Sequence, residues 1–441
     1  MKSSRSITLI IIIAILGLSW FSFLSTTIKQ ITVLSGYTSK AEESVKLGLY
    51  EQAIEFYHDA LEERTSKKYY NRMKEIYEVF YKEEASNYVR TLYIDDMLLA
   101  AEDYPKDASF WNAAIKLQLD AKDYSDAYDT VKKAINMGAG GEQLNKYNKQ
   151  LMYMEKVEYK IFTEVHTTLN GYNTVSTGSN WYVIDNDGQE LTEQYPYVGL
   201  INDEGYGIFN TGKEIRLLDK DQIVRSRFGN LKVDKAGYYS ASSEIFPALI
   251  GEKWSYINKD GKKIAEGYDI AGSFYNHQAV ASKDGKWELI NDKGEKKALN
   301  HFTDIKLDLY GCHQQGEVVI AKEGNKYHLY DSDFKRIGKF EADDIDICVN
   351  NGLIAFKSGG KWGFVDTEGK VVVEPKYKQA KSFANGYAAV CGDNGLWGFI
   401  NDKHEMVISA KFMNAYYFNN DETCFISKDG ETYQLMRFMF D

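Results

Sequence analysis

The stretch KWGFVDTEGKVVVEPKYKQAKSFANGYAAV, residues Lys361–Val390, decides the fold. It opens with an aromatic residue and a short apolar run, which end at an aspartate and a glycine. Alternating apolar residues face one side of a β-strand. The aspartate side chain can bond to the backbone of a tight turn, and glycine tolerates the positive φ that such a turn needs. The stretch therefore predicts a strand, a turn and a second strand, then a segment that leads into the next unit.

The same unit recurs along the C-terminal part of the chain. The distance between successive aromatic or apolar anchors runs from 33 residues, between Trp254 and Trp287, to 40, between Trp287 and Tyr327. Seven copies carry Asp or Asn four positions after the anchor, and only the last copy, with Arg437, does not. This near-constant period predicts a repeat architecture. The anchors, which we expect to be structural, are Trp181, Ile215, Trp254, Trp287, Tyr327, Trp362, Trp397 and Tyr433.

The two ends of the repeat region complement each other. The last copy stops near Met439, where a regular unit would continue, and the missing half precedes the first anchor at Tyr159–Val165. We therefore predict a closed, propeller-like ring of about eight units, in which the chain near Ile161 shares a sheet with the chain near Leu435. Closure removes exposed strand edges. The alternative is an open superhelix of β-hairpins, since the units are shorter than typical propeller blades.

Two copies carry the most specific motif. Lys361–Asp366 and Leu396–Asn401 resemble the bacterial WG (KWG) repeat. The resemblance extends from residue 158 to the C-terminus and weakens where another residue replaces the glycine after the anchor. It implies repetitive β structure and an interaction role, and it brings no catalytic residues. The replacing residues, which predict irregular copies, are Arg216, Ser255, Glu288 and His328.

Residues 38–150 have helical periodicity with few glycines and prolines. Small residues recur at matching positions of two segments, and these segments resemble tetratricopeptide (TPR) repeats. The resemblance implies three helical hairpins with a concave groove for a protein or peptide. A spacer without a binding role is the alternative. The positions that carry the resemblance are Gly48, read as a first-helix glycine, the packing residues Ala53, Ala60, Ala127 and Ala134, and the repeat-ending Pro105.

The N-terminal residues 1–28 contain an uncharged apolar run, Ile7–Leu24, preceded by Lys2 and Arg5. This pattern predicts a transmembrane helix with its N-terminus in the cytoplasm and the following domains outside it. A cleaved signal peptide is the alternative. The sequence thus predicts a multidomain α plus all-β protein with three parts: the anchor (1–28), the helical repeats (38–150) and the β repeats (158–441).

The composition argues against some classes of partner and site. The formal net charge of −11 disfavours a nucleic-acid partner, which needs a basic surface. The four cysteines (Cys312, Cys348, Cys391 and Cys424) form no C-x-x-C pair, so a zinc site has little support. We expect no catalytic residues, metal or cofactor. The sequence predicts a membrane-anchored, non-enzymatic binding or scaffolding protein. The alternative is a module that binds cell-wall polysaccharide, or a glycosidase, because exposed aromatic anchors can stack on sugars.

Overall fold

The computed structural model of the protein describes residues 28–229, 231–350 and 352–440. The chain forms two compact units, a helical unit that extends to Met152 and a β unit over Tyr153–Met439. The β unit begins before residue 158, because a short strand at its N-terminal end belongs to it.

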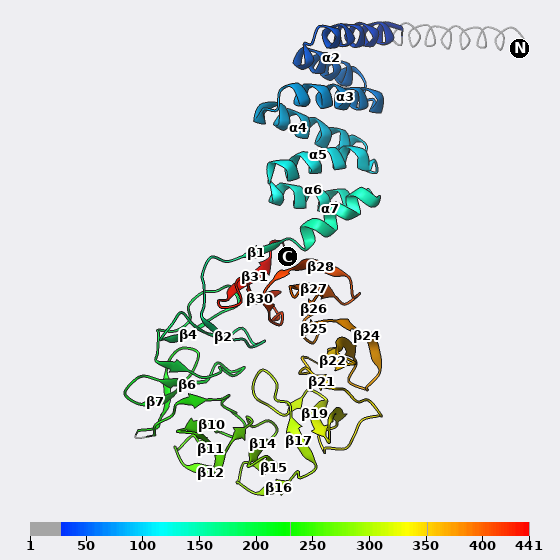
Figure 1. The fold of residues 1–441 in the computed structure, drawn as a ribbon. Coiled ribbons are helices and arrows are strands. Elements are labelled where there is room, and N and C mark those ends of the chain that lie inside the picture. Colours follow the sequence, from blue (N-terminus) through cyan, green and yellow to red (C-terminus); the bar gives the residue numbers. More distant parts are fainter. Residues whose placement is uncertain (1–27, 230, 351, 441) are drawn as a thin grey trace, which may run out of the picture. The chain divides into compact units, whose positions relative to one another are not determined.

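The helical unit is an array in which successive helices pack side by side (Figure 1). Ser86 and Asp107 cap two of the helices by accepting hydrogen bonds from the backbone N–H groups of Val89 (3.2 Å) and Ser109 (3.0 Å). Pro105 lies in the connection between two helices. The described helices are 28–46, α2 (Tyr50–Glu63), α3 (Lys67–Glu83), α4 (Asn87–Asp103), α5 (Ala108–Ala121), α6 (Tyr124–Asn136) and α7 (Glu142–Met152).

The small residues of the repeated helical pattern lie at the helix contacts. Ala53 and Ala60 on α2, and Ala127 and Ala134 on α6, are fully buried. Gly48 does not lie on a helix. It forms the turn before α2 with a φ of +74°. The positive φ of this turn explains why the residue is glycine.

The predicted transmembrane helix requires a correction. None of the helices in the described part of the chain is long and apolar enough to cross a membrane. The segment on which that prediction rested, Ile7–Leu24, lies outside the described residues. The prediction of a single-pass membrane protein with extracytoplasmic domains therefore finds no spanning helix among the described residues.

The β unit consists of eight small antiparallel sheets, here called blades 1 to 8 in chain order. Blade 1 holds β2 (Glu164–His166), β3 (Asn173–Ser176) and β4 (Trp181–Ile184); blade 2 holds β5 (Tyr197–Val198), β6 (Gly207–Asn210), β7 (Ile215–Leu218) and β8 (Val224–Arg227); blade 3 holds β9 (Lys235–Ala236), β10 (Ile245–Ile250), β11 (Lys253–Asn258) and β12 (Lys263–Tyr268); blade 4 holds β13 (Ile270–Ala271), β14 (Gln278–Lys283), β15 (Lys286–Asn291) and β16 (Lys296–Ala298).

The second half of the unit repeats this plan. Blade 5 holds β17 (Phe302–Ile305), β18 (Gln314–Gln315), β19 (Val318–Glu323) and β20 (Lys326–Tyr330); blade 6 holds β21 (Asp344–Ile345), β22 (Ile354–Ser358), β23 (Lys361–Val365) and β24 (Val371–Tyr377); blade 7 holds β25 (Gln379–Ala380), β26 (Tyr387–Cys391), β27 (Trp397–Asn401) and β28 (Met406–Phe412); blade 8 holds β29 (Asn414–Ala415), β30 (Thr423–Ser427), β31 (Gln434–Phe438) and, from the other end of the unit, β1 (Glu155–Val157).

The blades close into a ring. A separate apolar cluster fills each of the eight contacts between neighbouring blades, including the contact between blade 8 and blade 1. Because both faces of each sheet are covered, the middle strands are apolar on both sides, as in the buried pair Phe364 and Val365. The eighth sheet is completed by β1, which pairs antiparallel with β31 (Figure 1). The predicted closed ring is confirmed, and the open superhelix is wrong.

Residues from several blades meet in one buried cluster. Leu169, Val349, Ala384 and Tyr417 form one buried cluster, although they belong to blades 1, 6, 7 and 8. The Tyr310 hydroxyl accepts a hydrogen bond from the Leu169 backbone N–H (3.1 Å), which joins blades 5 and 1. These contacts hold the inner strands together across the ring.

Candidate functional site: a groove of the helical unit

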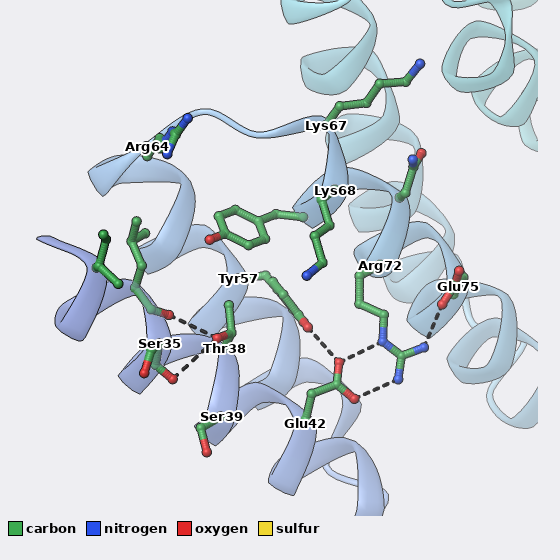
Figure 2. Close-up of a pocket in the computed structure, with 14 residues that line it drawn as sticks. Ser35, Thr38, Ser39, Glu42, Tyr57, Arg64, Lys67, Lys68, Arg72 and Glu75 are labelled. Carbon is green, nitrogen blue, oxygen red and sulfur yellow. Dashed lines mark hydrogen bonds and ion pairs between the residues drawn. The ribbon is translucent and has the colours of Figure 1, made fainter. Parts of the chain in front are cut away.

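A groove of about 1050 Å³ opens between the helix 28–46, α2 and α3. Its floor is built by Tyr57 of α2, whose ring is buried and whose hydroxyl donates to Glu42 Oε1 (2.6 Å). The groove is therefore a concave surface of the helical array, as expected for stacked hairpins. Figure 2 shows the side chains that line it.

Arg72 organises the acidic side chains of the groove. Its guanidinium donates from Nε to Glu42 Oε1 (2.7 Å) and from Nη2 to Glu42 Oε2 (2.8 Å), and its Nη1 donates to Glu75 Oε2 (2.7 Å). The hydrogen bonds from Arg72 lower the pKa of Glu42 to about 2, so this carboxylate is ionised at neutral pH. Arg72 thereby binds both carboxylates that line the groove and offsets one of their two negative charges (Figure 2).

The remaining basic side chains exceed the acidic ones. Lys67 pairs with Asp107 (2.6 Å). Within the described part of the chain, Arg64 and Lys68 have no carboxylate partner, and both are exposed. Figure 2 places the Lys68 amine on the groove side of α3, toward Tyr57. Arg64, Lys68 and Arg72 thus outnumber Glu42 and Glu75, and the groove carries a small net positive charge although the chain as a whole is acidic.

None of the predicted packing residues of the helical repeats lines this groove. Ala53 and Ala60 pack α2 against its neighbours, whereas Ala127 and Ala134 do the same on α6, away from it. The charged groove residues were not identified from sequence, because they come from the helix 28–46, from α3 and from the connection before α3. The spacing of Lys68 and Arg72, four residues apart on one helix face, was the available signal.

The eight anchors of the β repeats lie in eight different blades, and most are inaccessible. Tyr433 immediately precedes its strand, and the other seven lie within strands. Trp254, Trp362 and Tyr433 are half-buried. The buried anchors are Trp181, Ile215, Trp287, Tyr327 and Trp397.

The described residues show no group of three or more His, Cys, Asp or Glu side chains that could hold a metal ion. The cysteines Cys312, Cys348, Cys391 and Cys424 are buried, and no disulfide joins them. Burial raises the pKa of Cys424 and of Cys312 well above the usual value, which keeps both protonated.

Comparison with known proteins adds information on the β unit. The family model described as WG containing repeat matches residues 254–287, 362–396 and 397–431, each match beginning at an anchor tryptophan. No curated protein matches the chain.

Similar solved structures include Hsv2 of Kluyveromyces lactis (12% identity, 56% of this chain and 96% of that chain, TM-score 0.38). Others are a eukaryotic initiation factor (11%, 63% and 83%, TM-score 0.40) and the Pan2 WD40 domain of Neurospora crassa (10%, 55% and 89%, TM-score 0.34). With TM-scores this low, these likenesses carry no argument about function. The three family matches and the ring of eight sheets show that the β unit is an eight-bladed propeller that carries WG repeats.

Proposed function

We propose that the protein is a non-enzymatic interaction protein that binds an acidic segment of a partner protein in the groove of its helical unit. The propeller with WG repeats fits a protein-interaction or scaffold role. The observation that carries the proposal is the net positive charge that Arg64 and Lys68 give to the rim of a groove of about 1050 Å³. A volume of this size suits a peptide segment of several residues.

The charge arrangement favours a negatively charged occupant. The Glu42 and Glu75 carboxylates are already held by Arg72. Together with Arg64 and Lys68, the positive charges of the groove outnumber these two carboxylates, so an incoming carboxylate meets a net positive charge. The desolvation cost of such a ligand is low, because Arg64 and Lys68 remain at the exposed edge of the groove. The resemblance of α2 and α6 to TPR helices supports a peptide in the same concave surface.

The proposed absence of catalysis rests on the same groove. Its acidic side chains are paired with Arg72, and the low pKa of Glu42 makes this residue a poor general acid at neutral pH. The sugar-directed alternative required exposed aromatic anchors, but four of the seven aromatic anchors are buried and the other three are half-buried. A protein ligand is therefore better supported than a polysaccharide.

Fluorescence anisotropy with the full chain tests the proposal. Two labelled peptide pools of equal length are compared, one rich in Asp and Glu and the other rich in Lys and Arg. We expect the acidic pool to bind, and the double variant Arg64→Glu/Lys68→Glu to weaken that binding at least tenfold. Electrostatic steering also predicts a loss of affinity as salt is raised.

The matched control is Lys82→Glu, in the last turn of α3 but outside the groove. It changes the net charge of the same helix and should leave peptide binding within about twofold of the parent. Equal weakening by Lys82→Glu would show that only the overall charge matters. Equal binding of both pools would exclude an acidic ligand in this groove.

A further inference from the structure

A second basic pocket, of about 490 Å³, lies in the propeller where blades 6, 7 and 8 meet. Three lysines line it: Lys357 of β22, Lys378 of the connection between β24 and β25, and Lys381 directly after β25. No carboxylate pairs with any of these three lysines within the residues that the structure describes. Trp362 and Trp397 contribute apolar walls.

One carboxylate, Asp346, also lines the pocket, but its oxygens are occupied. Asp346 Oδ1 and Oδ2 accept hydrogen bonds from the Tyr417 hydroxyl (2.8 and 2.7 Å), and Oδ2 also accepts from the Ser382 backbone N–H (2.8 Å). Tyr417 additionally lies under the amine of Lys381, which is 5.2 Å from the ring centroid. Three positive charges therefore surround one carboxylate that is already engaged in joining blades 6, 7 and 8.

The repeat itself provides an internal reference for this pocket. Lys306 in blade 5 and Lys381 in blade 7 occupy equivalent positions. Each lysine directly follows the buried residue of its own blade's innermost strand, and each donates its backbone N–H to the adjacent strand of that blade. Lys306 forms an ion pair with Asp344 of the next blade (3.2 Å). The residue of blade 8 that corresponds to Asp344 is Asn414.

Asp344 and Asn414 have the same local geometry. Each accepts, through Oδ1, the backbone N–H of the residue that follows it, and both distances are 2.9 Å. The position therefore has the same backbone role in both blades, but only blade 6 supplies a negative charge to the neighbouring lysine. In the pocket, the amide of Asn414 replaces that charge and adds a donor group.

From this exchange we infer that the pocket lined by Lys357, Lys378, Lys381 and Asn414 binds a compact anion that carries carboxylate or phosphate groups. The lysines supply the positive charge, and Asn414 stands at the position where blade 6 has a carboxylate. A volume of 490 Å³ accommodates a small organic anion. This site lies in the β unit and is independent of the peptide groove of the helical unit.

Isothermal titration calorimetry of the full chain at low ionic strength tests the inference, with citrate and inorganic phosphate as probes. The two probes distinguish a carboxylate ligand from a phosphate ligand. We expect at least one of them to bind with a stoichiometry of one. Asn414→Asp, which removes no lysine, should weaken that binding at least tenfold, and Lys381→Gln should do the same.

The matched control is Asp344→Asn, which makes the reverse, acid-to-amide exchange at the equivalent position beside Lys306 and should leave binding in the pocket within about twofold. Circular dichroism confirms that each variant is folded. Absence of binding for both probes with a folded parent chain would overturn the inference. So would unchanged affinity of Asn414→Asp, since the carboxylate would then not compete with the ligand for the lysines.

Discussion

At the scale of single residues, the neighbouring strand explains why a glycine follows the anchor tryptophan. A Cβ on Gly363 would lie 2.3 Å from the Val373 carbonyl oxygen, and a Cβ on Gly398 would lie 2.5 Å from that of Ile408. In both blades the partner strand shifts its register opposite the glycine, which brings its backbone close. Glycine is therefore required at these two positions because there is no space for a side chain, and not because φ is positive.

We predict that Gly363→Ala lowers the free energy of unfolding by about 3 kcal/mol or more, because the added methyl group meets backbone that cannot move aside alone. Urea unfolding followed by tryptophan fluorescence measures the change. Ser255→Ala is the control at the corresponding position of blade 3, where a side chain is already accommodated. Its expected cost is about 1 kcal/mol or less. A similar small cost for Gly363→Ala would show that the bulge adapts.

At the scale of elements, the hairpins of the blades share one turn. Seven side chains, at the fourth position after each of the first seven anchors, accept two backbone N–H groups through Oδ1, from residues two and four positions later. These distances all lie between 2.8 and 3.1 Å. The side chain thus satisfies donors that the tight turn leaves without a strand partner. Both Asp and Asn occur at this position because only the acceptor oxygen is needed.

Replacing one of these acceptors tests that account. Asp366 accepts the N–H groups of Glu368 (3.1 Å) and Lys370 (2.8 Å). We predict that Asp366→Ala lowers the free energy of unfolding by about 1–2 kcal/mol, since two hydrogen bonds are lost in a solvent-accessible turn. Asp366→Asn keeps the acceptor and should unfold at nearly the same urea concentration as the parent. If both variants lose equal stability, the charge of Asp366 matters more than its turn geometry.

The sequence predicts these hairpins well, because their signals are local: an anchor, an apolar run and a turn residue lie within about ten residues. It predicts the two basic sites poorly. Glu42, Arg64 and Lys68 belong to different segments of the helical unit, and Lys381 and Asn414 belong to neighbouring blades. Their charge balance depends on which residues face one another across packed elements. No periodicity within one element contains that information.

At the scale of the β unit, the ring depends on a strand from its N-terminal end. Sequence placed this joining segment near Ile161, and Phe162 does form a bridge with Tyr433. The paired strand itself, however, is β1, several residues earlier, where Glu155 lies opposite Phe438 and Val157 opposite Met436. The strand EKV is too short to show alternation, so its place could not be read from the sequence. Without β1, β31 would expose an unpaired edge.

This closure leads to the last prediction. The backbone N–H of Glu158 donates to the Leu435 carbonyl (2.8 Å), so Glu158→Pro removes a bond between the two ends of the ring. We expect the free energy of unfolding to fall by about 1–3 kcal/mol, because the Leu435 carbonyl loses its partner. Hydrogen–deuterium exchange should quicken in β31 more than in β22 or β26.

Glu158→Ala separates the backbone bond from the side chain. It removes the ion pairs of Glu158 with Lys156 (3.1 Å) and Arg437 (3.5 Å) but keeps the N–H. Because surface ion pairs contribute little, this variant should retain most of the stability and the protection of β31. If the amide hydrogens of β31 exchange equally fast in Glu158→Pro and Glu158→Ala, then β1 does not hold the ring closed. If only Glu158→Pro loosens β31, then the stability of the last blade depends on a strand that precedes the first blade in the chain.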